Sequence, residues 1–158
     1  MGSGNNPPKQ KPILISACLL GEPCRYDAKG KENRTLLSQL EGHQLVAVCP
    51  EIEGGLSTPR PPAEQVGLKV LRENGEDVTP AFTQGASICT TKAVSAHIST
   101  AILKSRSPAC GCGEIYDGTF SKTLKSGDGV FTKALKAAGV ECISDEEFLS
   151  NSVVTSIS

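Results

Sequence analysis

Short apolar runs recur along this chain at wide intervals, and three of them lead into a cysteine. The first two run directly into Cys18 and Cys49, and the third leads through a short loop to Cys110. Apolar runs of this length, bounded by Gly and Pro, are typical of buried β-strands. Together with a fourth run, they predict strands at about residues 12–17, 44–48, 100–104 and 140–144.

The stretches between these runs have helical patterns. Apolar residues recur there at three- and four-residue spacing, which is typical of a helix with one buried face. Thr79 and Pro80 supply an N-cap and a first-turn proline, and Asp128 can cap a later helix. The patterns predict helices at about residues 33–41, 80–98 and 128–139.

The segment between the second strand and the second helix is rich in Gly and Pro. Gly54-Gly55 and the segment 58–62 exclude regular structure and indicate a long ordered loop, a kind of loop that is usually functional. Asn74-Gly75 then predicts the turn of a small hairpin between residues 68–72 and 77–79.

Alternating strands and helices predict an α/β fold. The 158 residues suffice for one domain with a real core. We therefore expect a single domain with a mostly parallel, Rossmann-like sheet flanked by helices, over residues 12–148. Residues 1–11 are expected to be a disordered tail, whose first four residues resemble an expression tag, and residues 149–158 a flexible one.

The three cysteines share one predicted location. Parallel strands place their carboxyl ends along one edge of a sheet, and ligands of open α/β sheets bind at that edge. Cys18, Cys49 and Cys110 follow such strand ends, so the sequence predicts a metal or cluster site there; the alternative is three separately buried thiols. Their spacings of 31 and 61 residues match no local zinc or ferredoxin motif.

The remaining cysteines have other interpretations. Cys89 falls on the apolar face of a predicted helix and Cys142 inside a predicted strand, so both are expected to be small buried hydrophobes. The roles of Cys24 and Cys112 are left undecided by the sequence: each could be a fourth ligand, a spare thiol or a resolving cysteine.

Charge and composition limit the partners and the cellular compartment that we expect for this chain. The net charge of −1 and the pI of about 6.1 provide no broad basic field, so nucleic acid is not an expected partner of this chain alone. There is no signal-peptide pattern and no apolar run near the roughly 20 residues of a membrane span. We expect a cytoplasmic protein, in which seven cysteines favour metal binding or catalysis over disulfides.

Carboxylates and a serine stand close to the cysteines in sequence. Glu51 and Glu53 follow Cys49 and could move protons beside a metal site, or they could be solvated loop residues. Ser107 could direct a hydroxyl to the same crevice, or it could be a turn serine before proline. The two histidines lie in no motif, so a Cys/His nucleophile pair is not favoured.

Many segments together resemble the thiouracil desulfurases, once catalogued as a bacterial domain of unknown function. The resemblance runs in order from about residue 12 to residue 145. The matching segments are Ser16–Gly21, Cys24–Asp27, Cys49–Glu51 with Gly54-Gly55, Thr58–Glu64, Asp77–Thr79, Ala101–Lys104, Arg106–Pro108, Cys110-Gly111 and Ile115–Phe120.

The resemblance implies a cofactor, a reaction and residue roles. It implies a 4Fe–4S cluster held by Cys18, Cys49 and Cys110, with one iron free of protein ligands. It also implies an enzyme, hydrolase- or lyase-like, that converts the thiocarbonyl of thiouracil to a carbonyl without net redox change and releases hydrogen sulfide. Glu53 corresponds to the acid/base glutamate and Ser107 to the assisting serine. Ala109 departs from the pattern, because the family more often has a second serine there.

Two alternatives remain at this point. The substrate could be a thiolated nucleoside or tRNA instead of a small thiolated pyrimidine. The thiols could also form a closed zinc or iron–sulfur site in a non-catalytic module. The choice between 2-thio and 4-thio compounds is open, and the oligomeric state is expected to be a monomer or a small homo-oligomer.

Overall fold

The computed structural model describes residues 12–22 and 32–157, the last six of these by backbone alone. Its central element is a four-stranded parallel sheet with the strand order β2-β1-β5-β8. The strands are β1 (Ile13–Ser16), β2 (Leu45–Val48), β5 (Thr100–Leu103) and β8 (Glu141–Ser144). All four lie where the apolar runs predict them, and the single-domain α/β fold with a parallel sheet flanked by helices is confirmed.

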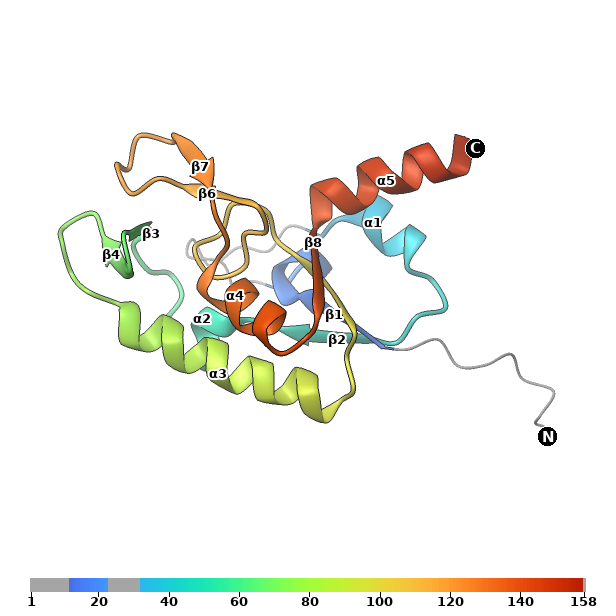
Figure 1. Cartoon of the computed structure of the whole chain (residues 1–158), viewed down its shortest axis with the longest axis horizontal. Helices are drawn as coiled ribbons and strands as arrows, with labels where there is room; N and C mark the ends of the chain where they lie inside the picture. The colour runs from blue at the N-terminus through green and yellow to red at the C-terminus, as the bar shows by residue number, and fades with distance from the viewer. Residues whose placement is uncertain (1–11, 23–31, 158) are drawn as a thin grey trace.

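Helices cover both faces of this sheet (Figure 1). They are η1 (Ala17–Leu20), α1 (Arg34–Gln39), α2 (Pro50–Glu53), α3 (Thr79–Ser95), α4 (Val130–Ala137) and α5 (Asp145–Ile157). The side chains of β1 alternate between two cores because successive residues of a strand point to opposite faces. Leu14 packs with the residues of α3 and α4, whereas Ile13 and Ile15 pack with those of α1 and α5.

The strand order defines a topological switch point. From β1 the chain passes to β2 on one side and then returns to β5 on the other side of β1. Connections that leave two adjacent parallel strands in opposite directions open a crevice at the carboxyl ends of those strands. In this fold the crevice lies at the ends of β1 and β5.

Two antiparallel hairpins lie beyond this sheet and were not predicted with these bounds. They are β3 (Ala63–Val66) with β4 (Lys69–Arg72), and β6 (Glu114–Tyr116) with β7 (Leu124–Ser126). The first of them turns at Gly67, which has a positive φ of 63°. The small hairpin predicted at Asn74-Gly75 is also present, as an antiparallel bridge between Leu71 and Asp77 whose turn is closed by the Gly75 N–H on the Arg72 carbonyl. Figure 1 shows the two hairpins at the same end of the molecule.

The C-terminal segment forms helix α5, where the sequence suggested a flexible tail. The Ser144 hydroxyl accepts a hydrogen bond from the Glu147 N–H, which caps the first turn. Three acidic residues in that turn also suit the positive end of the helix dipole. Ser144 with Glu147 three residues on is a capping-box pattern, and it is visible in the sequence.

Two predictions fall outside the described residues, namely the disordered N-terminal tail and any role of Cys24. No helix in the described part of the chain combines the length and the apolar character needed to cross a bilayer.

Candidate active site

A cavity of about 380 Å³ opens at the carboxyl ends of β1, β2 and β5. This volume falls within the range of small-molecule sites, roughly 300–1,000 Å³. Its position is the crevice that the strand order predicts.

Three cysteines form one side of this cavity, which we call the cysteine wall: Cys18, Cys49 and Cys110. Cys18 lies in η1 directly after β1, Cys49 is the N-cap of α2 directly after β2, and Cys110 lies in the loop that follows β5. Cys18 and Cys110 are buried and Cys49 is partly exposed. The structure thus brings together the three thiols that the sequence singled out.

The chemistry of this wall suits an iron–sulfur centre, because soft thiolates are the ligands of such clusters. The three thiols come from separate strand ends and line one cavity. Burial raises the pKa of the Cys110 thiol, so its thiolate needs a compensating positive charge, which a metal centre supplies.

The other described cysteines lie away from the cavity lining. Cys89 lies on the buried face of α3, and burial raises the pKa of its thiol to about 12. Cys112 donates a hydrogen bond to the Cys142 carbonyl at 3.3 Å, and neither residue contacts the cavity. The thiols of the described lining are therefore those of the cysteine wall.

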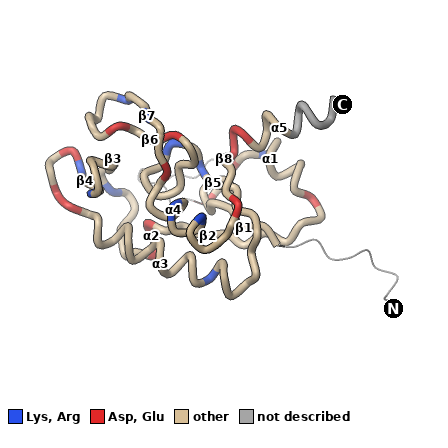
Figure 2. Tube along the Cα trace, in the orientation of Figure 1, with Lys and Arg blue, Asp and Glu red and all other residues tan. Residues whose placement is uncertain are grey.

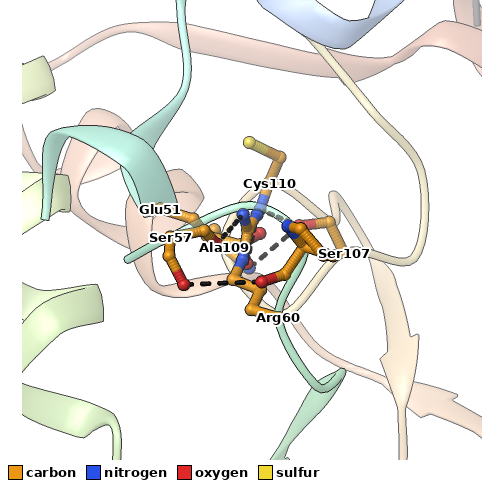
Figure 3. A network of polar contacts seen from close by, with 7 residues as sticks. Glu51, Ser57, Arg60, Ser107, Ala109 and Cys110 are labelled. Carbon is orange, nitrogen blue, oxygen red and sulfur yellow. Dashed lines mark hydrogen bonds and ion pairs between the residues drawn. The ribbon is translucent and has the colours of Figure 1, made fainter. Parts of the chain in front are cut away.

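Glu51 is the carboxylate beside the cysteines. It lines the cavity. Its Oε1 accepts a hydrogen bond from Arg60 Nε at 3.1 Å and forms an ion pair with Arg60 Nη2 at 3.0 Å. The Arg60 side chain is only 2% exposed, so this pair is largely shielded from water. Burial raises the pKa of Glu51, and the charge and hydrogen bond of Arg60 oppose that rise without cancelling it. Figure 3 shows this pair close to Cys110 and Ser107.

Glu53 lies elsewhere. The segment Pro50–Glu53 is a single helical turn, and residues two apart on a helix point to different faces. Glu53 is absent from the cavity lining, and its Oε1 pairs with Lys92 Nζ of α3 at 2.7 Å. The structure therefore brings Glu51, and not the sequence-selected Glu53, to the cysteines. Proline is common at the first position of a helix, so Pro50 signals a helix start directly after Cys49. That signal could have indicated that Glu51 and Glu53 point in different directions.

Two glycines set the position of this helical turn. A Cβ on Gly54 would overlap the carbonyl oxygen of Ala81, and a Cβ on Gly85 would overlap that of Pro50. Because both positions lack a side chain, α2 lies directly against α3 and holds Cys49 and Glu51 at the cavity.

Ser107 shapes the loop that carries Cys110 and also lines the cavity. Its Oγ accepts hydrogen bonds from the N–H groups of Ala109 and Cys110, both at 3.0 Å, which folds the loop that carries the third cysteine (Figure 3). Because both of these bonds use the oxygen as acceptor, the hydroxyl proton remains available for donation. Ser107 lines the cavity, so this donor lies at the site.

The opposite side of the cavity comes from the hairpins, and we call it the loop wall: Glu64, Tyr116, Phe120 and Lys122. Glu64 Oε1 accepts hydrogen bonds from the N–H groups of Gly118 and Phe120, at 3.0 and 3.1 Å. These bonds hold a loop in which Phe120 and Lys122 have positive φ angles of 57° and 61°. Non-glycine residues rarely adopt such angles unless neighbouring contacts impose them.

Basic residues also reach the cavity. Lys104 and Lys122 line it, and neither forms an ion pair with a described acidic residue. Arg106 lines it too, but its guanidinium is engaged by both carboxylate oxygens of Glu146. Elsewhere basic and acidic residues are scattered over the described chain (Figure 2), in keeping with the absence of a broad basic field from the composition.

Glu64, Arg60 and Lys104 were not selected for the site from the sequence. Glu64 and Arg60 lie in the Thr58–Glu64 segment, where the density of proline indicated a fixed backbone path but not its destination. Lys104 ends an apolar run, and a charge at the carboxyl end of a predicted parallel strand is a usable signal for a site.

The fold and the cavity define an α/β protein with a thiol-lined small-molecule site at the carboxyl edge of its sheet. The chain belongs to the 2-thiouracil desulfurase family, whose model matches residues 13–147. The structure is similar to that of the [4Fe-4S]-dependent thiouracil desulfidase TudS, with a TM-score of 0.82 and 39% sequence identity over 94% of this chain and 100% of that one. The uncharacterized protein YbbK of Bacillus subtilis (strain 168) is 39% identical over 145 residues, covering 85% of this chain and 96% of YbbK.

Proposed function

We propose that this protein is an iron–sulfur-dependent desulfidase that converts the thiocarbonyl group of a thiouracil to a carbonyl and releases hydrogen sulfide. One observation carries the proposal: three thiols from separate strand ends line one cavity together with Glu51 and Ser107, in a chain of the desulfurase family. The reaction balances as thiouracil plus water giving uracil plus hydrogen sulfide, so it needs no external oxidant or reductant.

Cys18, Cys49 and Cys110 are the residues that would hold a 4Fe–4S cluster. With three protein ligands, such a cluster supplies one iron that is open to a soft sulfur and acts there as a Lewis acid. The position of the three thiols in the lining of one cavity and the cost of a bare thiolate at Cys110 support this assignment.

Glu51 and Ser107 are the groups that would handle protons. A carboxyl with a raised pKa is a stronger base than an ordinary glutamate and is suited to take a proton from water and to return it. Ser107 can donate its hydroxyl proton toward the cavity while its oxygen stays fixed by two backbone N–H groups. We therefore assign the acid/base role to Glu51 in place of Glu53.

The function is tested by anaerobic reconstitution with iron and sulfide, followed by an assay for sulfide release from 2-thiouracil and 4-thiouracil. We expect about four irons per chain and release of sulfide with formation of uracil. Tight zinc binding without iron uptake would instead support the non-catalytic module, and iron uptake without sulfide release from any thiolated pyrimidine would contradict the enzymatic proposal.

The two glutamates provide a matched pair of variants. We expect Glu51→Gln to keep the cluster absorbance and to lose about 100-fold or more in kcat, the usual effect of losing a general acid or base. Glu53→Gln, which removes the charge that faces Lys92, is expected to leave kcat close to that of the wild type. The reverse pattern would return the acid/base role to Glu53.

A specific observation favours a larger substrate as a second candidate. Lys104 and Lys122 place two cations in the lining, whereas a free thiouracil base has no phosphate for them to bind. A thiolated nucleoside monophosphate would satisfy both the base site and these cations. A higher kcat/KM for 4-thiouridine monophosphate than for 4-thiouracil, reduced by Lys122→Ala, would support it. Equal values for both compounds would favour the free base.

A further inference from the structure

Phe120 is the phenylalanine that belongs to neither hydrophobic core. The chain has four phenylalanines. Phe82 and Phe131 are buried in the core that includes α3 and α4, and Phe148 packs against the core on the other face of the sheet. Phe120 is instead half-buried in the lining of the cavity, beside Tyr116. A large apolar ring in this position can bury its remaining surface against a ligand.

The loop that carries Phe120 has a polar side and a cavity side. Four residues at alternate positions are joined through hydrogen bonds between their side chains: Asp117, Thr119, Ser121 and Thr123. None of the four belongs to the described lining of the cavity, whereas Phe120 and Lys122, which lie between them in sequence, do. The Asp117 N–H also donates to the Thr123 carbonyl at 2.9 Å and closes the loop. The polar side chains thus brace the loop and leave Phe120 on the cavity side.

The backbone at Phe120 is held in a conformation that phenylalanine rarely adopts. Its φ of 57° lies in the left-handed region. The Phe120 N–H donates to Glu64 Oε1 at 3.1 Å, and the Gly118 N–H donates to the same oxygen at 3.0 Å. Such a conformation costs free energy, persists where neighbouring contacts impose it, and is common at ligand-binding sites. A loop fixed in this way loses little further conformational freedom when a ligand binds.

We propose that Phe120 selects flat pyrimidine rings by stacking its own ring on the ring of the substrate, an inference that deepens the function proposed above and rests on it. A thiouracil ring is planar and has two π faces, and stacking on an aromatic side chain is a common way in which proteins hold such rings. Stacking acts on the ring and not on the thiocarbonyl, so it is independent of the sulfur chemistry at the cysteine wall. Phe120 is thus a specificity-determining residue.

Two variants at the same position separate the aromatic face from the rest of the side chain. Phe120→Leu keeps an apolar side chain but removes the face, and Phe120→Tyr keeps it. None of the three side chains is branched at its β-carbon, so all meet the backbone conformation of the loop in a similar way. Phe148→Leu is the matched control, because Phe148 is a partly buried phenylalanine outside the described lining of the cavity.

Uracil and dihydrouracil form a matched pair of ligands, since they carry the same carbonyl and N–H groups and differ in the planarity of the ring. Equilibrium dialysis against the reconstituted protein measures their dissociation constants without turnover. We expect the wild type to bind uracil about tenfold more tightly than dihydrouracil, and Phe120→Leu to lose that preference by losing affinity for uracil. Phe120→Tyr and Phe148→Leu should keep the wild-type ratio.

Three results would overturn the inference. They are a wild-type ratio in Phe120→Leu, an equally reduced ratio in Phe148→Leu, and a ratio in Phe120→Tyr as low as that in Phe120→Leu. The wild type alone covers the case in which Phe120→Leu does not fold, because a wild type that binds both ligands equally would also overturn it.

Sulfide release from 2-thiouracil provides the kinetic test. Stacking stabilises the bound substrate and the transition state alike, so Phe120→Leu should raise KM about tenfold and leave kcat within about twofold of the wild type. A lower kcat at an unchanged KM would contradict the stacking role. Wild-type protein that prefers uracil but releases no sulfide would contradict the proposed function alone, and wild-type protein that releases sulfide without preferring uracil would contradict this inference alone.

Discussion

The two sides of the cavity are held in place by different means. The cysteine wall rests mainly on the parallel sheet, because Cys18 and Cys49 directly follow strands whose register is set by backbone hydrogen bonds. Cys110 lies in a short loop after β5, which the Ser107 hydroxyl folds. The loop wall depends on side chains, since two N–H groups of its loop are bound to the Glu64 carboxylate. Gln65 adds a second link by donating to the carbonyls of Pro108 and Asp128.

This difference suggests that the two walls have different functions. A strand register cannot shift without moving every side chain of the strand, so the spacing of the three thiols resists change. A loop held by one carboxylate can be reshaped by a few substitutions, and loops on a rigid scaffold commonly determine what a site binds. We infer that the cysteine wall serves the cofactor and the loop wall selects the substrate.

The largest expected effect comes from breaking the cysteine wall. Cys110→Ala should reduce the iron content from about four atoms per chain to a small fraction of that and abolish sulfide release, because the remaining two thiols cannot retain a cluster. Cys142→Ala is the matched control, as this partly buried cysteine lies outside the cavity. Iron analysis after reconstitution decides the matter, and full iron with full activity in Cys110→Ala would remove it from the ligand set.

A smaller effect is expected from displacing the loop wall. Gly118 has a φ of 94°, and a Cβ there would lie 2.6 Å from the Gln65 carbonyl oxygen. Gly118→Ala should lower kcat/KM by about 10- to 100-fold, in line with about 1–3 kcal/mol of local strain, while iron content stays at the wild-type level. Gly75→Ala controls for backbone strain, because Gly75 has a φ of 91° with open space around it. Loss of iron in Gly118→Ala would show that the two walls are not separable.

Removing the side chain that holds the loop should have a milder effect. Glu64→Ala loses both hydrogen bonds to the loop and is expected to raise KM about tenfold, the equivalent of roughly 1–2 kcal/mol. Glu64→Gln keeps an oxygen that can accept them and should fall between this variant and the wild type. Steady-state kinetics on the reconstituted enzyme measure the KM of both variants. An unchanged KM in Glu64→Ala would show that the loop does not contribute to substrate binding.

The same contrast explains which features were accessible from the sequence. The strands of the parallel sheet are buried apolar runs, so their positions and the cysteines at their ends follow from local patterns. The strand sequences Glu114–Tyr116 and Leu124–Ser126 are short, mostly polar and without alternation. Nothing in their residue pattern distinguishes them from turns, because the packing around such short strands, more than their own propensity, decides whether they pair.

The choice between the two glutamates shows a second limit. Both follow Cys49 closely, and the resemblance to the family assigns the acid/base role to Glu53, whereas Glu51 is the one that lines the cavity. Their difference arises from one helical turn whose orientation depends on the packing of Gly54 against α3. Such a tertiary contact leaves no trace in the spacing of the glutamates themselves.

The smallest expected effect tests whether side-chain bonds near the cysteine wall matter only for stability. Asp128 Oδ1 accepts the Gly113 N–H at 2.8 Å, and its Oδ2 pairs with Lys136 at 2.9 Å. Burial raises the pKa of Asp128, but the Lys136 and Gly113 bonds outweigh this and hold it below the ordinary 3.8. The charged carboxylate therefore stabilises the folded state above that pH, and the benefit is lost as the pH falls through the lowered pKa.

Asp128→Asn should accordingly lower the free energy of unfolding of the apo-protein by about 1 kcal/mol at neutral pH. The difference from the wild type should shrink as the pH falls from neutral to below the lowered pKa of Asp128, where both chains carry a neutral side chain. Urea unfolding at the two pH values measures this, and Lys136→Gln separates the ion pair from the bond to Gly113. Iron content and KM should stay at wild-type values, since the strand register, and not this carboxylate, sets the spacing of the thiols. A loss of iron as large as that of Cys110→Ala would mean that the cysteine wall, like the loop wall, depends on side-chain bonds.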